Sequence, residues 1–136
     1  MTLTDTGPLV ALVNKNDPNH TRCVAATKHL SAEPLVTTWP CFTEAMYLLF
    51  QAGGYPAQAE LWRWWTAGRL VLHDLTGGEM DRMAALMDKY RDRPMDLADA
   101  SLVAAVELLG LRSVFTLDSD FHIYRMADGS ALDCVP

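Results

Sequence analysis

Short apolar runs and longer segments of helical periodicity alternate along this chain. The short runs are rich in Val, Leu, Thr and Phe, as is typical of strands that are buried on both faces. The strand candidates are residues 1–5, 34–38, 69–75, 112–118 and, at one edge, 130–136. The helix candidates are residues 6–14, 17–32, 40–51, 55–68, 77–93 and 97–109. This alternation predicts an α/β fold with a mostly parallel central sheet of about four or five strands, flanked by helices on both faces.

The length and composition of the chain agree with one globular domain covering residues 1–136. Half of the residues are hydrophobic, and the formal net charge is -6, so the protein has no general basic field that would attract a nucleic acid. The three cysteines are far apart in sequence and form no metal-binding spacing, which favours reduced thiols in a cytoplasmic protein. We find no signal peptide at residues 1–14 and no apolar run of membrane-spanning length, so no membrane is expected as a partner.

Acidic residues occur where the predicted strands end. Ligands of parallel α/β sheets bind beyond the carboxyl ends of the strands, so these acids are the first candidates for a site. Asp5 directly follows the first strand, although it is equally suited to capping the next helix. Glu44 is the only charged residue between Glu33 and Glu60, in a helix that is apolar nearly all round. Such a helix should be buried on most sides, where an unpaired carboxylate is costly; a solvated position at the rim is the alternative.

The helix predicted at 97–109 begins with two acids that have different roles. Asp96 is placed to cap its N-terminus, because its side chain can accept from the free N–H groups of the first turn. Helical periodicity puts Asp99 on the same side as Leu102 and Val106, the side that a helix normally buries. We therefore expect Asp96 to be the cap and Asp99 to point into a cleft.

A fourth acid follows the apolar strand near residue 115. Asp118 comes directly after it and Asp120 two residues later. A turn would use the same residue types, so this segment alone leaves both interpretations open. Several carboxylates in one cleft repel one another and persist when a cation neutralises them, and all-oxygen donors suit Mg²⁺ or Mn²⁺. The four histidines are scattered, and the common nucleotide-binding and serine-hydrolase motifs are missing.

Four segments together resemble the PIN domain family, and within it the VapC-type toxins of toxin–antitoxin pairs. These segments occur in the family's order and span nearly the whole chain; they are TDTGPLVAL, TEA, DLADASLVA and FTLDSDF. The resemblance implies that Asp5, Glu44, Asp99 and Asp118 form a catalytic pocket that holds one or two Mg²⁺ or Mn²⁺ ions. It implies an endoribonuclease that hydrolyses RNA with a metal-activated water. It also implies a homodimer and a cognate antitoxin protein as partners.

Residues near the acids are candidates for supporting roles. Thr4, Thr6 and Thr116 can orient water around a metal, although capping and strand propensity explain them equally well. Five cations are candidates for contacting RNA, either beside the tryptophans of residues 61–69 or just before the acidic helix: Arg63, Arg69, Lys89, Arg91 and Arg93. The tryptophans also fit a core or subunit interface, and the second group fits an ordinary cationic helix end.

Two other functions compete with the ribonuclease. A catalytically silent PIN-like module would only bind a partner protein, and the presence of every proposed ligand disfavours it. A phosphoacceptor or phosphatase would use Asp5 as a nucleophile, but such designs usually have a second acid nearby, and here Asp5 is followed by Thr6, Gly7 and Pro8.

Overall fold

The computed structural model describes all residues 1–136 and has a five-stranded, fully parallel sheet at its centre. The strand order is β3-β2-β1-β4-β5. The strands are β1 (Thr2–Thr4), β2 (Leu35–Thr38), β3 (Leu70–His73), β4 (Ser113–Phe115) and β5 (Asp133–Val135). The predicted α/β class and sheet are confirmed, including the short strand at the edge.

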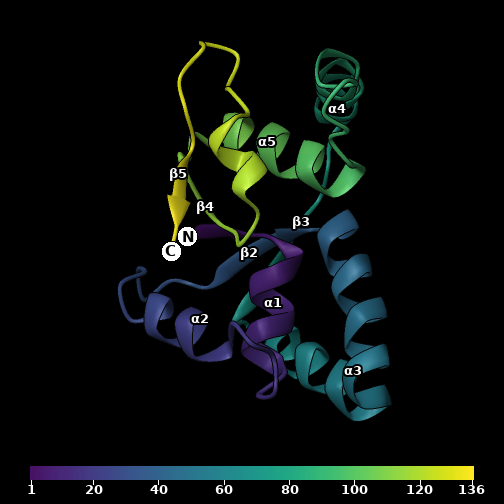
Figure 1. The fold of residues 1–136 in the computed structure, drawn as a ribbon, viewed down its shortest axis with the longest axis vertical. Helices are drawn as coiled ribbons and strands as arrows, with labels where there is room; N and C mark the ends of the chain where they lie inside the picture. The colour runs from purple at the N-terminus through teal and green to yellow at the C-terminus, as the bar shows by residue number, and fades with distance from the viewer.

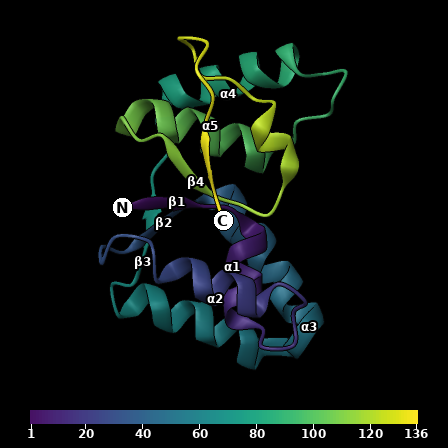
Figure 2. The same cartoon turned by 60° about the vertical axis from the view of Figure 1, so that its left-hand side comes forward.

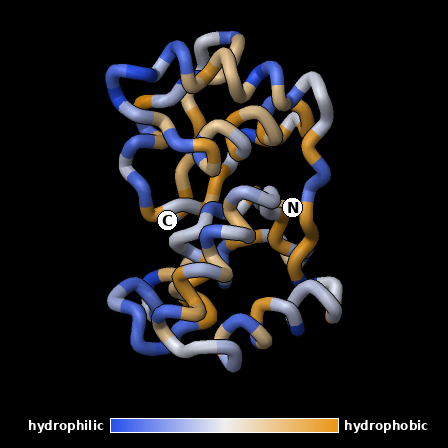
Figure 3. The backbone as a smooth tube through the Cα atoms, turned by 90° about the vertical axis from the view of Figure 1, so that its right-hand side faces the viewer, coloured by the Kyte–Doolittle hydropathy of each residue, from blue (hydrophilic) through white to orange (hydrophobic).

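Helices cover both faces of the sheet (Figures 1 and 2). On one face lie α1 (Thr6–Val13), α2 (His20–Thr27) and α3 (Trp39–Thr66). On the other lie α4 (Gly77–Lys89) and α5 (Leu97–Leu109), and a short 3-10 turn, η1 (Ser119–His122), follows β4. In Figure 3 many of the hydrophobic segments run between these layers. No helix combines the length and apolar character needed to cross a bilayer.

Two glycines set the ends of helical segments as the sequence predicts. Helix α3 is bent at Gly54, whose φ of 66° is outside the helical range, so its two halves correspond to the helices expected at 40–51 and 55–68. Helix α5 ends at Gly110, which has a left-handed conformation with φ 66°. The bend of α3 lets its second half fold back along the first.

Helix α5 is the most deeply buried helix and is central to one of two main cores. Residues 98–106 are all buried, because the helix packs between α4 and the sheet. Its core includes Leu102, Val103 and Val106 together with Leu3 and Val114 from the central strands. A second core on the opposite face joins α1, α3 and β3. The acids at the helix starts are therefore held by well-packed elements rather than by mobile loops.

Candidate active site

The proposed site is at the carboxyl ends of β1, β2 and β4. Asp5 follows β1, and its backbone N–H donates to Phe115 O at 2.9 Å, which continues the pairing between β1 and β4. Glu44 lies in the first half of α3, which begins directly after β2. Asp99 lies in the first turn of α5, which packs against β1 and β2. The topology thus brings acids from distant parts of the chain to one edge of the sheet, as the strand-end rule predicts.

Asp5 is buried and both of its carboxylate oxygens accept hydrogen bonds. Its side chain is 7% exposed; Oδ1 accepts from Thr6 N at 2.7 Å and Oδ2 accepts from Thr116 Oγ1 at 2.8 Å. Burial raises its pKa from 3.8 to about 6; the bonds from Thr116 and Thr6 lower it, and the charges of Asp118 and Asp96 raise it. Asp5 therefore caps α1, as expected, and is also a pocket acid that ionises reluctantly.

Asp99 is the most strongly perturbed acid of the pocket. It is 6% exposed, and Oδ2 accepts from Tyr124 OH at 2.9 Å. Its pKa is raised from 3.8 to about 8, mainly by burial and also by the charges of Asp96, Asp5 and Asp118, while the hydrogen bond from Tyr124 lowers it. A second carboxylate charge in this pocket is unfavourable without a cation.

Asp96 and Asp99 divide their roles as predicted from the helix pattern. Asp96 is exposed and has an extended backbone, and its Oδ1 accepts from Asp99 N at 2.7 Å. It is the N-cap of α5, while Asp99 points inward. The capping prediction is confirmed; the metal-binding role of Asp99 remains a prediction.

Glu44 lies at the exposed rim, and the expectation that its helix is buried on most sides is wrong. Tyr47 and Phe50, on the same half of α3, are 62% and 58% exposed. Solvent explains how a charge is tolerated in this apolar segment. Glu44 is nevertheless tied to the pocket, because Thr6 Oγ1 donates to its Oε2 at 3.2 Å. Thr6 thus contacts Glu44 through its hydroxyl and Asp5 through its backbone N–H.

Asp118, rather than Asp120, influences the pKa values of the buried acids. The charge of Asp118 raises the pKa of both Asp5 and Asp99, whereas Asp120 affects Tyr124. Asp118 also starts η1, since its Oδ1 accepts from Asp120 N at 2.9 Å. The turn and the site therefore use the same residue, which favours Asp118 as the fourth acid.

Hydroxyl groups surround the buried acids, although not all the predicted ones. Thr6 and Thr116 donate to pocket carboxylates. The Thr4 hydroxyl instead donates to Thr2 O at 3.1 Å, so its role in orienting water stays a prediction without a direct contact to an acid. Two contacts escaped the sequence analysis: Tyr124 on Asp99, and Cys41, whose Sγ lies 3.8 Å from Asp5 Oδ1. Neither has a local signal, because each lies more than twenty residues from its partner.

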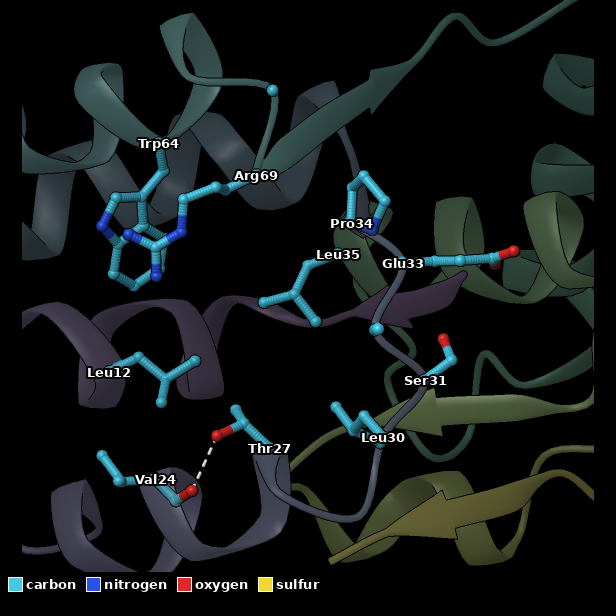
Figure 4. Close-up of a pocket in the computed structure, with 12 residues that line it drawn as sticks. Leu12, Val24, Thr27, Leu30, Ser31, Glu33, Pro34, Leu35, Trp64 and Arg69 are labelled. Carbon is cyan, nitrogen blue, oxygen red and sulfur yellow. Dashed lines mark hydrogen bonds between the residues drawn. The ribbon is translucent and has the colours of Figure 1, made fainter.

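The five cations proposed to contact RNA separate into two groups. Arg69 lies just before β3 and stacks over Trp64 at 5.5 Å, in a cavity of about 460 Å³ at the amino ends of the strands (Figure 4). Leu12 and Leu35 also line this cavity. It faces away from the acids, and Arg63 pairs with Glu60 on the surface of α3. A role for these two arginines beside the acids is therefore not supported.

The other basic segment borders the acidic pocket. Lys89, Arg91 and Arg93 are exposed at the end of α4 and in the following turn. Between them, the Tyr90 ring packs edge-on against Tyr124 with centroids 5.1 Å apart, and Tyr124 donates to Asp99. Cations therefore lie on one side of a pocket that is itself negative.

The donors of the pocket fit a hard divalent cation in their chemistry. They are carboxylate oxygens, and two of the acids have raised pKa values because they are buried and lie near other carboxylates. No group of three or more His, Cys, Asp or Glu side chains is drawn together tightly enough to enclose an ion. Mg²⁺ usually binds one or two carboxylates and keeps several waters, so a closed cage is not required.

Known proteins that resemble this chain were found by fold and by sequence. No family model matches the chain. Its fold matches VapC20 of Mycobacterium tuberculosis, a sarcin-ricin loop cleaving toxin, with a TM-score of 0.84 and 16% identity over 100% of both chains. It also matches VapBC2 of Rickettsia felis, solved on a fragment of promoter DNA, with a TM-score of 0.68 and 12% identity over 99% of this chain and 98% of the other. The parallel sheet and the helices around it thus have the arrangement seen in these toxin structures.

One relative is similar to this chain in sequence over nearly its full length. The chain is 27% identical over 133 residues to ribonuclease VapC26 of Mycobacterium tuberculosis, covering 97% of this chain and 98% of that protein. Over nearly its full length the chain is therefore similar to a VapC-type ribonuclease.

Proposed function

We propose that this protein is an endoribonuclease that acts as the toxin of a toxin–antitoxin pair. The observation that carries the proposal is the pair of buried acids, Asp5 and Asp99, which arrive from different elements and share one negative pocket. The full-length similarity to a VapC ribonuclease supports the same reaction. RNA in the cytoplasm is the proposed substrate.

The pocket requires a cation to work at neutral pH. We propose that Asp5, Glu44, Asp99 and Asp118 hold one or two Mg²⁺ or Mn²⁺ ions, which supply a lowered pKa for water and neutralise charge on the phosphodiester. Thr6 and Thr116 keep the Asp5 carboxylate in one orientation, and Tyr124 does the same for Asp99. The exposed cations Lys89, Arg91 and Arg93 attract the RNA backbone to a molecule whose net charge is negative.

Two protein partners complete the proposal. Solved structures of similar fold include a toxin–antitoxin complex from Klebsiella pneumoniae, with a TM-score of 0.65 and 20% identity over 89% of this chain and 90% of the other, which supports a cognate antitoxin. Exposed aromatic side chains on α3, among them Phe50, Tyr55 and Trp65, offer an apolar surface for a homodimer.

The decisive experiment tests cleavage and metal together. The purified protein should cleave total cellular RNA with Mg²⁺ or Mn²⁺ and stop in EDTA. Asp5→Asn should lose both cleavage and calorimetric Mn²⁺ binding, whereas Asp92→Asn, a matched change on an exposed turn, should retain both. Expression without antitoxin should slow growth, and Glu44→Gln should relieve it.

Two outcomes would contradict the proposal. A folded wild-type protein that cleaves no RNA, with a Glu44→Gln variant that is equally toxic, would favour the silent binding module. Undiminished Mn²⁺ affinity in Asp5→Asn would show that the acids do not share a metal site.

A further inference from the structure

A groove lies between the start of α3 and the start of α5, beside the acidic pocket. Figure 1 shows these two helix ends next to each other, and they are in contact. The groove has a volume of about 710 Å³, and its lining includes Trp39, Thr43, Glu44, Tyr47, Asp96 and Leu97. It is thus continuous with the proposed site, because Glu44 is joined to Asp5 through Thr6 and Asp96 caps the helix that carries Asp99.

The walls of the groove expose large apolar side chains that nothing in the monomer covers. Trp39, Tyr47 and Leu97 are 45%, 62% and 49% exposed. Trp39 and Tyr47 are eight residues apart on α3, so they lie on the same face of the helix. The Trp39 ring is supported from below by an edge-on contact with Phe42, with centroids 5.6 Å apart at 84°. Trp39 therefore packs against Phe42 while nearly half of it stays exposed to solvent.

The negative charge of the groove favours some kinds of ligand over others. Glu44 and Asp96 are both exposed within it, and Asp96 uses one carboxylate oxygen for the helix cap while the other has no partner. An apolar protein surface would bury these carboxylates without partners, which is costly. A phosphate would be repelled. A nucleobase offers a flat face for stacking and N–H groups that donate to a carboxylate.

We propose that this groove binds an unpaired base of the RNA next to the cleaved phosphodiester, with the Trp39 ring stacking on the base and Asp96 accepting from its exocyclic amine. The inference rests on the proposed ribonuclease function. It assigns a preference for adenine, guanine or cytosine over uracil at one position, since uracil has no exocyclic amine.

The test uses a short RNA that contains a cleavage site mapped on cellular RNA. Trp39→Ala should lower kcat/KM by roughly 5- to 100-fold, mainly through KM, because one base loses its stacking partner. Trp39→Phe should retain most of the activity. Leu108→Ala, which removes an exposed apolar side chain from the opposite end of α5, is the control and should change little.

An abasic substitution at each nucleotide flanking the cut identifies the stacked base. At one position, removing the base should lower the kcat/KM of the wild type as much as Trp39→Ala does. The same abasic RNA should not lower the kcat/KM of Trp39→Ala any further. Asp96→Asn should reduce the preference for amine-bearing bases there.

The inference is overturned if an active wild type shows the same Trp39→Ala loss on intact and abasic RNAs, or if Trp39→Ala only disrupts a dimer measured by light scattering and leaves RNA kinetics unchanged. A wild type that cleaves no RNA overturns the proposed function itself, so the two failures are distinguishable.

Discussion

The acid Asp99 predicts an unusual dependence of stability on pH in the metal-free protein. Its pKa is about 8 in the folded state instead of the ordinary 3.8. The folded state therefore keeps a proton that the unfolded chain has already released. Stability from this group is present at low pH and is lost as the pH rises from the unfolded pKa toward the folded one. Asp99→Asn has no proton to release there, and the amide oxygen can still accept from Tyr124.

The magnitude follows from the width of this pH window. A full proton of difference between the two states changes the free energy of unfolding by about 1.4 kcal/mol per pH unit. Between about pH 5 and about pH 7, the wild type should therefore lose about 2–3 kcal/mol more than Asp99→Asn does. Asp5, whose pKa is about 6, contributes in both proteins and largely cancels in the comparison.

Urea denaturation followed by circular dichroism in EDTA measures this difference directly. Wild type, Asp99→Asn and the exposed control Asp92→Asn are compared at three pH values across the window. We expect the control to follow the wild type and Asp99→Asn to be more stable than both at the highest pH. Parallel pH profiles for all three proteins would refute the argument that burial among other carboxylates raises the Asp99 pKa.

Three further predictions concern neighbouring residues. Asp96→Ala should lower the free energy of unfolding by about 0.5–2 kcal/mol in chemical denaturation, as loss of an N-cap does; an unchanged midpoint would contradict the capping role. Tyr124→Phe should reduce the metal-dependent cleavage rate or the Mn²⁺ affinity by about 10- to 100-fold, because Asp99 loses its hydroxyl partner, and a fully active variant would show that this bond is dispensable. Replacing the basic segment by alanines should weaken RNA binding and flatten its salt dependence, whereas Arg69→Ala should do neither; the residues to replace are Lys89, Arg91 and Arg93.

Features of the fold and of the site could be predicted from the sequence where they depend on residues close together in the chain. Strand-helix alternation predicted the parallel sheet, and the spacing of Asp96 and Asp99 predicted which is the cap and which is buried, because both depend on periodicity over a few residues. The break between the helices expected at 40–51 and 55–68 was also predicted, because glycine ends helices, and it lies at Gly54.

Prediction failed where the answer depended on contacts between distant segments. The apolar character of α3 suggested burial, yet Tyr47 and Phe50 are exposed, because hydrophobicity does not distinguish a core from an interaction surface. Tyr124 reaches Asp99 across 25 residues, and no pattern around either residue announces that contact. The proximity of Arg69 to tryptophans in sequence likewise said nothing about which end of the sheet it occupies.

The central position of β1 has a consequence for synthesis of the protein. Thr116, which donates to Asp5, is made 111 residues after it, and β1 remains without one of its two neighbours until β4 emerges. A nascent chain that ends before β4 lacks both Asp118 and the Thr116 hydroxyl, which donates to Asp5. Because domains fold as units once their contacts are available, the acids should assemble only after β4 has been made. A chain interrupted before β4 would thus carry Asp5, Glu44 and Asp99 without an assembled site.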